Sequence, residues 1–127
     1  MGKNILIIDD EQMITTSLQK LLKKKGYDPT IVSSGKSALE EIKTRDFDLV
    51  VLDIRMPEMD GIETIQAIRE HCSAAGKNPI PEIVITGYAD ESKYKSAVDL
   101  KVAAYIYKPF DIKDFLDTIQ RTLDVKK

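Results

Sequence analysis

The sequence predicts an α/β fold, a doubly wound parallel sheet of five strands with five helices. Short runs of β-branched and aliphatic residues alternate with longer stretches whose apolar residues recur at helical spacing. The central run, LVVL at 49–52, is apolar without alternation, as in a strand buried on both faces. Five strands alternating with five helices imply helices on both faces of the sheet, joined by right-handed crossovers.

In the first half, residues 4–8 (NILII) predict a strand, and leucines at helical spacing then continue to Gly26, which ends the first helix. Residues 30–32 predict a shorter, more polar strand at or near the sheet edge. Ser33-Ser34-Gly35 begins the second helix, and 49–52 form the third strand.

In the second half, an apolar stripe from Ile62 to Cys72 predicts the third helix, and 73–81 predict a loop rich in Gly, Asn and Pro. Residues 82–86 (EIVIT) and 103–107 (AAYIY) predict the last two strands. Between them, residues 90–100 predict a helix with a weak apolar stripe.

The last helix is expected to begin after Asp111, whose side chain can cap its first turn. Its apolar positions recur at helical spacing and predict one buried face. The residues of this face are Ile112, Phe115, Leu116, Ile119 and Leu123.

The bulk properties suit one cytoplasmic domain, expected over residues 1–127. The net charge of −2 argues against general binding to nucleic acid or to an anionic membrane. The single cysteine, Cys72, excludes an internal disulfide and fits a reducing compartment. No apolar run is long enough for a transmembrane helix, and the first residues do not resemble a signal peptide.

Polar residues follow four of the predicted strands, where each strand ends. They are Asp9 and Asp10, Asp53, Thr86 and Lys108. Taken singly, each has an ordinary interpretation, such as a helix cap or a solvated charge. Because parallel strands all end at the same edge, where ligands bind in open α/β sheets, we expect these residues to line one crevice.

The chemistry of this set indicates phosphoryl transfer. Neighbouring carboxylates repel one another unless a cation is present, and Mg²⁺ suits a site with a few carboxylates, waters and a phosphate oxygen. Lys108 adds a fixed positive charge and Thr86 a hydrogen-bond donor, and both can stabilise a phosphoryl group. Asp53 is the central carboxylate, so we expect it to be the nucleophile and to form an acyl phosphate.

Four stretches, IIDDE, VVLDIRMPEMDG, ITGYAD and YIYKPF, together resemble the receiver domain of two-component response regulators. The resemblance covers residues 3 to about 125 and implies a flavodoxin-like fold with strand order 2-1-3-4-5. It implies that Asp10, Asp53 and the backbone carbonyl of Arg55 ligate Mg²⁺ directly, with Mn²⁺ as an alternative ion. Asp9 would act through a bound water.

The resemblance further implies that Asp53 accepts a phosphoryl group from a sensor histidine kinase or a phosphotransfer protein. Thr86 and Lys108 would contact the phosphoryl oxygens, and Tyr105 matches the aromatic switch residue of the family. The chain would then be a signalling switch and not an enzyme with a separate substrate, although it supports its own phosphotransfer and dephosphorylation. A homodimer could form through the face made by the helix at 90–100, the last strand and the last helix.

Two other functions remain as alternatives. An aspartate-nucleophile phosphohydrolase also uses a strand-end aspartate and magnesium, but it carries a second acidic residue two positions later, where this chain has Arg55. A flavin-binding electron carrier of the same fold would need a Ser/Thr/Gly-rich phosphate loop where this chain has Asp9-Asp10-Glu11. Both a stand-alone receiver and the first part of a larger regulator fit the sequence.

Overall fold

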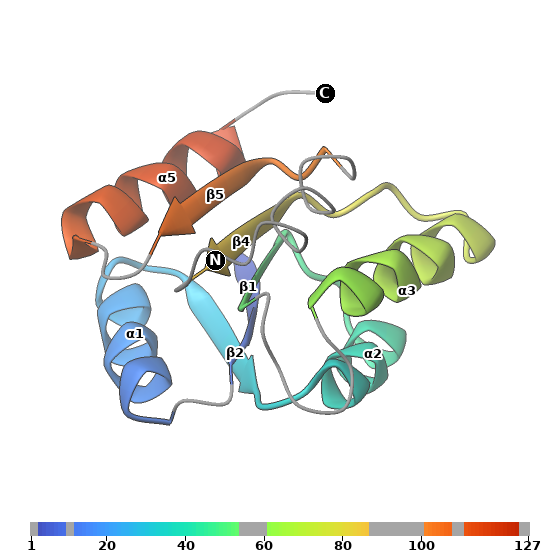
Figure 1. The fold of residues 1–127 in the computed structure, drawn as a ribbon, viewed down its shortest axis with the longest axis horizontal. Helices are drawn as coiled ribbons and strands as arrows, with labels where there is room; N and C mark the ends of the chain where they lie inside the picture. Colours follow the sequence, from blue (N-terminus) through green and yellow to red (C-terminus); the bar gives the residue numbers. More distant parts are fainter. Residues whose placement is uncertain (1–2, 10–11, 54–60, 87–100, 108–110, 125–127) are drawn as a thin grey trace.

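The computed structural model describes residues 3–9, 12–53, 61–86, 101–107 and 111–124 (Figure 1). Its five strands are all parallel and form one sheet in the order β2-β1-β3-β4-β5, which confirms the order that the resemblance implied. The strands are β1 (Asn4–Ile8), β2 (Asp28–Val32), β3 (Leu49–Asp53), β4 (Glu82–Thr86) and β5 (Ala104–Tyr107).

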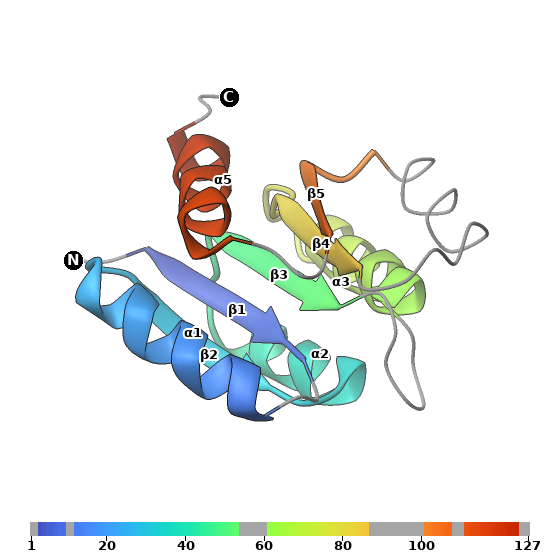
Figure 2. The same cartoon turned by 60° about the vertical axis from the view of Figure 1, so that its left-hand side comes forward.

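The described residues contain four of the five expected helices, and the one expected at 90–100 lies outside them. Figures 1 and 2 show α1 and α5 on one face of the sheet and α2 and α3 on the other. None of the described helices is long and apolar enough to cross a membrane. The helices are α1 (Gln12–Lys24), α2 (Gly35–Thr44), α3 (Gly61–Ala74) and α5 (Ile112–Asp124).

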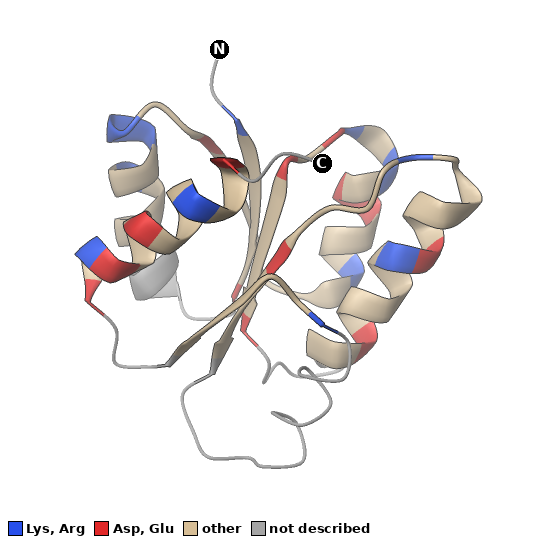
Figure 3. Cartoon of the chain, turned by 90° about the horizontal axis from the view of Figure 1, so that it is seen from above, with Lys and Arg blue, Asp and Glu red and all other residues tan. Residues whose placement is uncertain are grey.

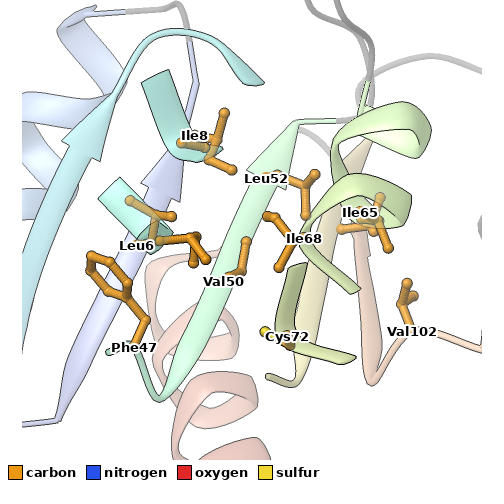
Figure 4. Close-up of a cluster of buried hydrophobic side chains, with 12 residues drawn as sticks. Leu6, Ile8, Phe47, Val50, Leu52, Ile65, Ile68, Cys72 and Val102 are labelled. Carbon is orange, nitrogen blue, oxygen red and sulfur yellow. The ribbon is translucent and has the colours of Figure 1, made fainter. Parts of the chain in front are cut away.

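The sheet separates two apolar clusters, because alternate residues of each strand point to opposite faces. Leu6, Val50 and Leu52 pack toward α2 and α3, where Ile68 meets them (Figure 4). The residues between them in the strands pack toward α1 and α5. Charged residues lie on the helices and near the strand ends, and the strands are otherwise uncharged (Figure 3).

Cys72 belongs to the cluster beneath α3, as a small core residue would. Burial raises the pKa of its thiol, which keeps it neutral.

Several element bounds differ from the prediction by one or two residues, and the third strand includes Asp53 in addition to residues 49–52. The second strand begins at Asp28 and not at Thr30, because it pairs in register with β1 from Asn4 onward. The third helix continues through Ala74, so residues 73 and 74 are not part of the loop. The fifth strand begins at Ala104, one residue later than expected.

Glycines end α1 and α3 in the same way. Gly76 has a φ of +71°, and its N–H donates to the carbonyl of Ser73 while the N–H of Lys77 donates to that of Cys72. Gly26, with a φ of +93°, ends α1 through the equivalent pair of bonds. These positions use a left-handed conformation that glycine adopts without a steric penalty, so Gly76 terminates α3 just after its last residue, Ala74.

The predicted apolar face of α5 is only partly covered. Phe115 and Ile119 are buried in the core, and Leu116 and Leu123 pack against it. Ile112, which was predicted to be buried, is 42% exposed. It lies in the first turn of α5, before the residues that enter the core, so helical spacing alone gave the wrong environment for it.

Replacing Ser34 with alanine is expected to lower the free energy of unfolding by about 1 kcal/mol. Ser34 caps α2, since its Oγ accepts a hydrogen bond from the N–H of Ser37 at 3.1 Å. Urea unfolding measures the change. Ser33→Ala is the matched control, because Ser33 is exposed and precedes the cap, and its effect should stay within about 0.5 kcal/mol. Equal losses in the two variants would contradict the assignment of the cap.

Candidate functional site at the carboxyl edge of the sheet

Two buried aspartates lie side by side at the carboxyl edge of the sheet. Asp53 is the last residue of β3, and Asp9 directly follows β1. β1 and β3 are parallel, and Ile8 lies opposite Leu52. Asp9 and Asp53 are the residues that come directly after this pair, so they follow at the same level of the sheet. Asp9 is 3% exposed and Asp53 6%, so both carboxyl groups are largely withdrawn from water.

The neighbouring strands hold both aspartates in place. The N–H of Asp9 donates to the carbonyl of Val32 at 3.1 Å, which ties it to the end of β2. Asp53 is paired with Ile85 in the β3–β4 ladder. Every residue of β3 is buried, so the backbone beneath Asp53 is fixed by strands on both sides.

The donor set suits a hard divalent cation. Two carboxylates on adjacent strands offer the oxygen ligands that Mg²⁺ prefers, and a cation would offset the cost of burying like charges together. The buried Oδ2 atom of Asp9 accepts no hydrogen bond from the described residues. No group of three potential ligand side chains occurs among the described residues, and the predicted third carboxylate, Asp10, lies outside them.

The backbone register places Thr86 next to the aspartates. Thr86 ends β4, one position beyond Ile85, the partner of Asp53. Thr86 also pairs with Tyr107, the last residue of β5. Lys108 is the next residue in the sequence after Tyr107. Lys108 and Arg55, like Asp10, lie outside the described residues, and their predicted roles remain predictions.

Tyr105 lies on the strand adjacent to Thr86. It pairs with Val84, two residues before the threonine, and packs half-buried against the cluster beneath α2 and α3. Its role as a switch stays a prediction.

A buried ion pair, which the sequence did not predict, lies at the opposite edge of the sheet. Glu82 begins β4 and is 3% exposed, and the guanidinium of Arg69 on α3 donates to both of its carboxylate oxygens at 2.9 Å. The Glu82 carboxylate holds the pKa of Arg69 above its ordinary value. The sequence held one signal for this pair, because Glu82 is an acidic residue directly before three apolar strand residues in the run EIVIT.

Comparisons with known proteins agree with this geometry. The family model described as "Response regulator receiver domain" matches residues 5–120. The transcriptional regulatory protein ZraR of Escherichia coli K12 is 36% identical over 121 residues, which cover 94% of this chain and 26% of ZraR. The alkaline phosphatase synthesis transcriptional regulatory protein PhoP of Bacillus subtilis is 35% identical over 114 residues, or 90% of this chain and 45% of PhoP.

Solved structures show the same fold. A CheY-like response regulator receiver domain protein from Methanospirillum hungatei is 30% identical, with a TM-score of 0.87 over 98% of this chain and 95% of that one. The FixJ-N structure is 27% identical, with a TM-score of 0.82 over 100% of this chain and 98% of that one. The chain thus spans whole receiver structures, but only about a quarter of the length of ZraR and under half of that of PhoP.

Proposed function

The chain belongs to the response regulator receiver domain family, and from this premise we propose that Asp53 is its phosphoacceptor. It is a signalling switch of two-component systems, and a phosphohydrolase function is not favoured. The observation that carries the assignment of Asp53 is its burial at the end of the central strand, beside Asp9. We further propose that residues 1–127 form one receiver domain that works in the cytoplasm.

In the proposed reaction, a carboxylate oxygen of Asp53 attacks the phosphorus of a phosphohistidine on a sensor kinase or phosphotransfer protein. The new phosphorus–oxygen bond forms as the phosphorus–nitrogen bond breaks, which leaves an acyl phosphate on Asp53 and a free imidazole on the donor. Lys108 and Thr86 hold the phosphoryl oxygens. The same groups would position water for the later loss of the phosphate.

Receiver domains in general depend on magnesium, and here Asp9, Asp10, Asp53 and the Arg55 carbonyl would hold the ion. The ion supplies positive charge against the phosphoryl oxygens and the clustered carboxylates. The two described members of this set, Asp9 and Asp53, are buried oxygen donors on adjacent strands, which fits the ion.

Phosphorylation would act through Thr86, Lys108 and Tyr105. Charge-assisted hydrogen bonds contribute about 1.5–3 kcal/mol each. Two of them approach the roughly 5.5 kcal/mol needed to convert a 1:99 equilibrium into 99:1. A shift of Thr86 toward the phosphoryl group would open space for Tyr105, two register positions away on the next strand.

The output is proposed to be contact with protein. The face made by the 90–100 segment, β5 and α5 would respond to the switch and could form a homodimer or bind an output domain. ZraR and PhoP are transcriptional regulatory proteins by name, yet the net charge of −2 argues against nucleic-acid contact by this chain itself.

The direct test is incubation of the chain with acetyl phosphate and Mg²⁺. We expect intact-protein mass spectrometry to show the gain of one phosphoryl group, and EDTA to prevent it. Beryllofluoride, which mimics an acyl phosphate, should change the tryptic or amide-exchange pattern near β4 and β5. A chain that neither gains phosphate nor responds to beryllofluoride would contradict the proposal.

Magnesium is expected to stabilise the fold even without phosphate. An ion that binds only the native state at ten times its Kd adds about 1.4 kcal/mol to the free energy of unfolding. Thermal unfolding with and without Mg²⁺ measures this gain. Asp9→Asn should reduce it, whereas Asp114→Asn, which removes an exposed charge on α5, should keep it. A gain of equal size in all three proteins would indicate a nonspecific effect of the salt.

A further inference from the structure

A pocket lies at the amino edge of the sheet, opposite the edge that carries Asp9 and Asp53. Its volume is about 450 Å³, which is a usual size for a small-molecule site. Two connections form its walls, since residues 45–48 join α2 to β3 and residues 76–81 join α3 to β4. The whole length of β3 separates the pocket from the candidate phosphoacceptor, so the two sites are distinct.

The floor of the pocket is apolar. Phe47 and Cys72 are buried near the amino end of β3 (Figure 4), and Ile42 is buried with them. Ile80 lines the pocket from the 76–81 wall and is half-buried against the same core cluster. A ligand group that covers this floor would leave water for an apolar surface, which favours binding.

The walls carry charges of both signs. The lining contains two basic and two acidic side chains and is formally neutral, and these residues are Arg45, Lys77, Asp46 and Asp48. Asp48 already accepts a hydrogen bond from the N–H of Asn4 at 2.8 Å. The Nζ atom of Lys77 lies 3.0 Å from the Oδ1 atom of Asp46, and this ion pair joins the two walls. The two side chains are 40% and 87% exposed, so their pairing contributes little and can be exchanged for a ligand.

We propose that this amino-edge pocket binds a free α-amino acid with a large apolar side chain. The ammonium group of the ligand would pair with Asp46 and its carboxylate with Lys77, in place of the ion pair between the walls. The side chain of the ligand would cover Phe47 and Ile80. Opposite charges on the two walls favour a zwitterion, because an anion or a cation would leave one wall charge without a partner. The proposal does not depend on phosphorylation of Asp53.

L-Tryptophan is the probe for the test, because the chain contains five tyrosines and no tryptophan. The indole can therefore be excited beyond the tyrosine absorption, and its fluorescence anisotropy rises when it is bound. We expect saturable binding with a Kd below about 1 mM. Tryptamine lacks the carboxylate and indole-3-propionate lacks the ammonium group. Each should bind about fivefold more weakly, near the upper end for a partly exposed charge pair.

Two variants assign the charged groups of the ligand to the walls. Lys77→Gln should weaken the binding of L-tryptophan about fivefold but not that of tryptamine, which has no carboxylate to place. Asp46→Asn should weaken the binding of L-tryptophan but not that of indole-3-propionate. Both side chains are exposed, so the fold should persist in each variant.

The matched control is Lys113→Gln, which removes an exposed lysine from α5 on the other face of the sheet. It should leave the affinity for all three ligands unchanged. The proposal is overturned if L-tryptophan shows no saturable binding in the millimolar range. It is also overturned if the three ligands bind equally well, since the charged walls would then play no part, or if Lys113→Gln causes the same loss as Lys77→Gln.

Discussion

Replacing Asp53 with asparagine is expected to abolish phosphorylation by acetyl phosphate. The amide has nearly the shape of the carboxylate but lacks its nucleophilic oxygen anion, and no acyl phosphate can form on it. Intact-protein mass spectrometry should show full modification of the native chain over time and none of the variant. The matched control is Asp124→Asn, an exposed position at the end of α5, which should be modified at the native rate.

The fold of Asp53→Asn should remain intact, so a loss of phosphorylation can be assigned to chemistry. Asp9 and Asp53 are buried on adjacent strands, and neutralising one of them removes a like-charge repulsion. In the absence of Mg²⁺ the variant should therefore unfold at the same temperature as the native chain or at a higher one. If Asp53→Asn still gains a phosphoryl group, a different residue is the acceptor and the assignment of Asp53 is wrong.

Replacing Arg69 with methionine is expected to lower the free energy of unfolding by about 3 kcal/mol. The change leaves the Glu82 carboxylate buried without the two hydrogen bonds that it accepts at 2.9 Å. Removing one partner of a buried pair costs about 3–5 kcal/mol. The lower end applies because the side chain of Arg69 is 35% exposed, so water can partly replace it. Urea unfolding measures the loss.

A double-mutant cycle measures the interaction free energy between Arg69 and Glu82, apart from the effect of each substitution alone. Glu82→Leu in the Arg69→Met background replaces the ion pair by apolar side chains and should recover most of the lost stability, as it does for other buried pairs. Arg121→Met on α5, whose side chain is exposed, is the matched control and should change stability by under about 0.5 kcal/mol. Additive losses in the double variant would show that Arg69 and Glu82 act independently.

The sequence predicted most of this architecture because its signals were local. The apolar runs at 4–8 and 82–86 coincide with β1 and β4, and Ser34 and Gly26 mark helix ends through their own backbone preferences. The third helix was predicted to end before residue 73, but it continues to Ala74, and Gly76 is the residue that terminates it.

The candidate site was predictable in part for a different reason. Parallel strands necessarily end at one edge, so Asp9, Asp53 and Thr86 could be grouped before their register was known. The register then determined which of them are neighbours: Asp9 beside Asp53, and Thr86 one position beyond the partner of Asp53.

By itself, then, the sequence determined the fold class, the helix and strand positions to within a few residues, and the set of polar residues at one edge of the sheet. Only the tertiary structure decided that Ile112 stays exposed and that Glu82 is buried against Arg69. Periodicity identifies the apolar side of a helix, because it depends on local geometry alone. Which neighbouring element covers that side, and how far, depends on contacts between residues that are distant in the chain.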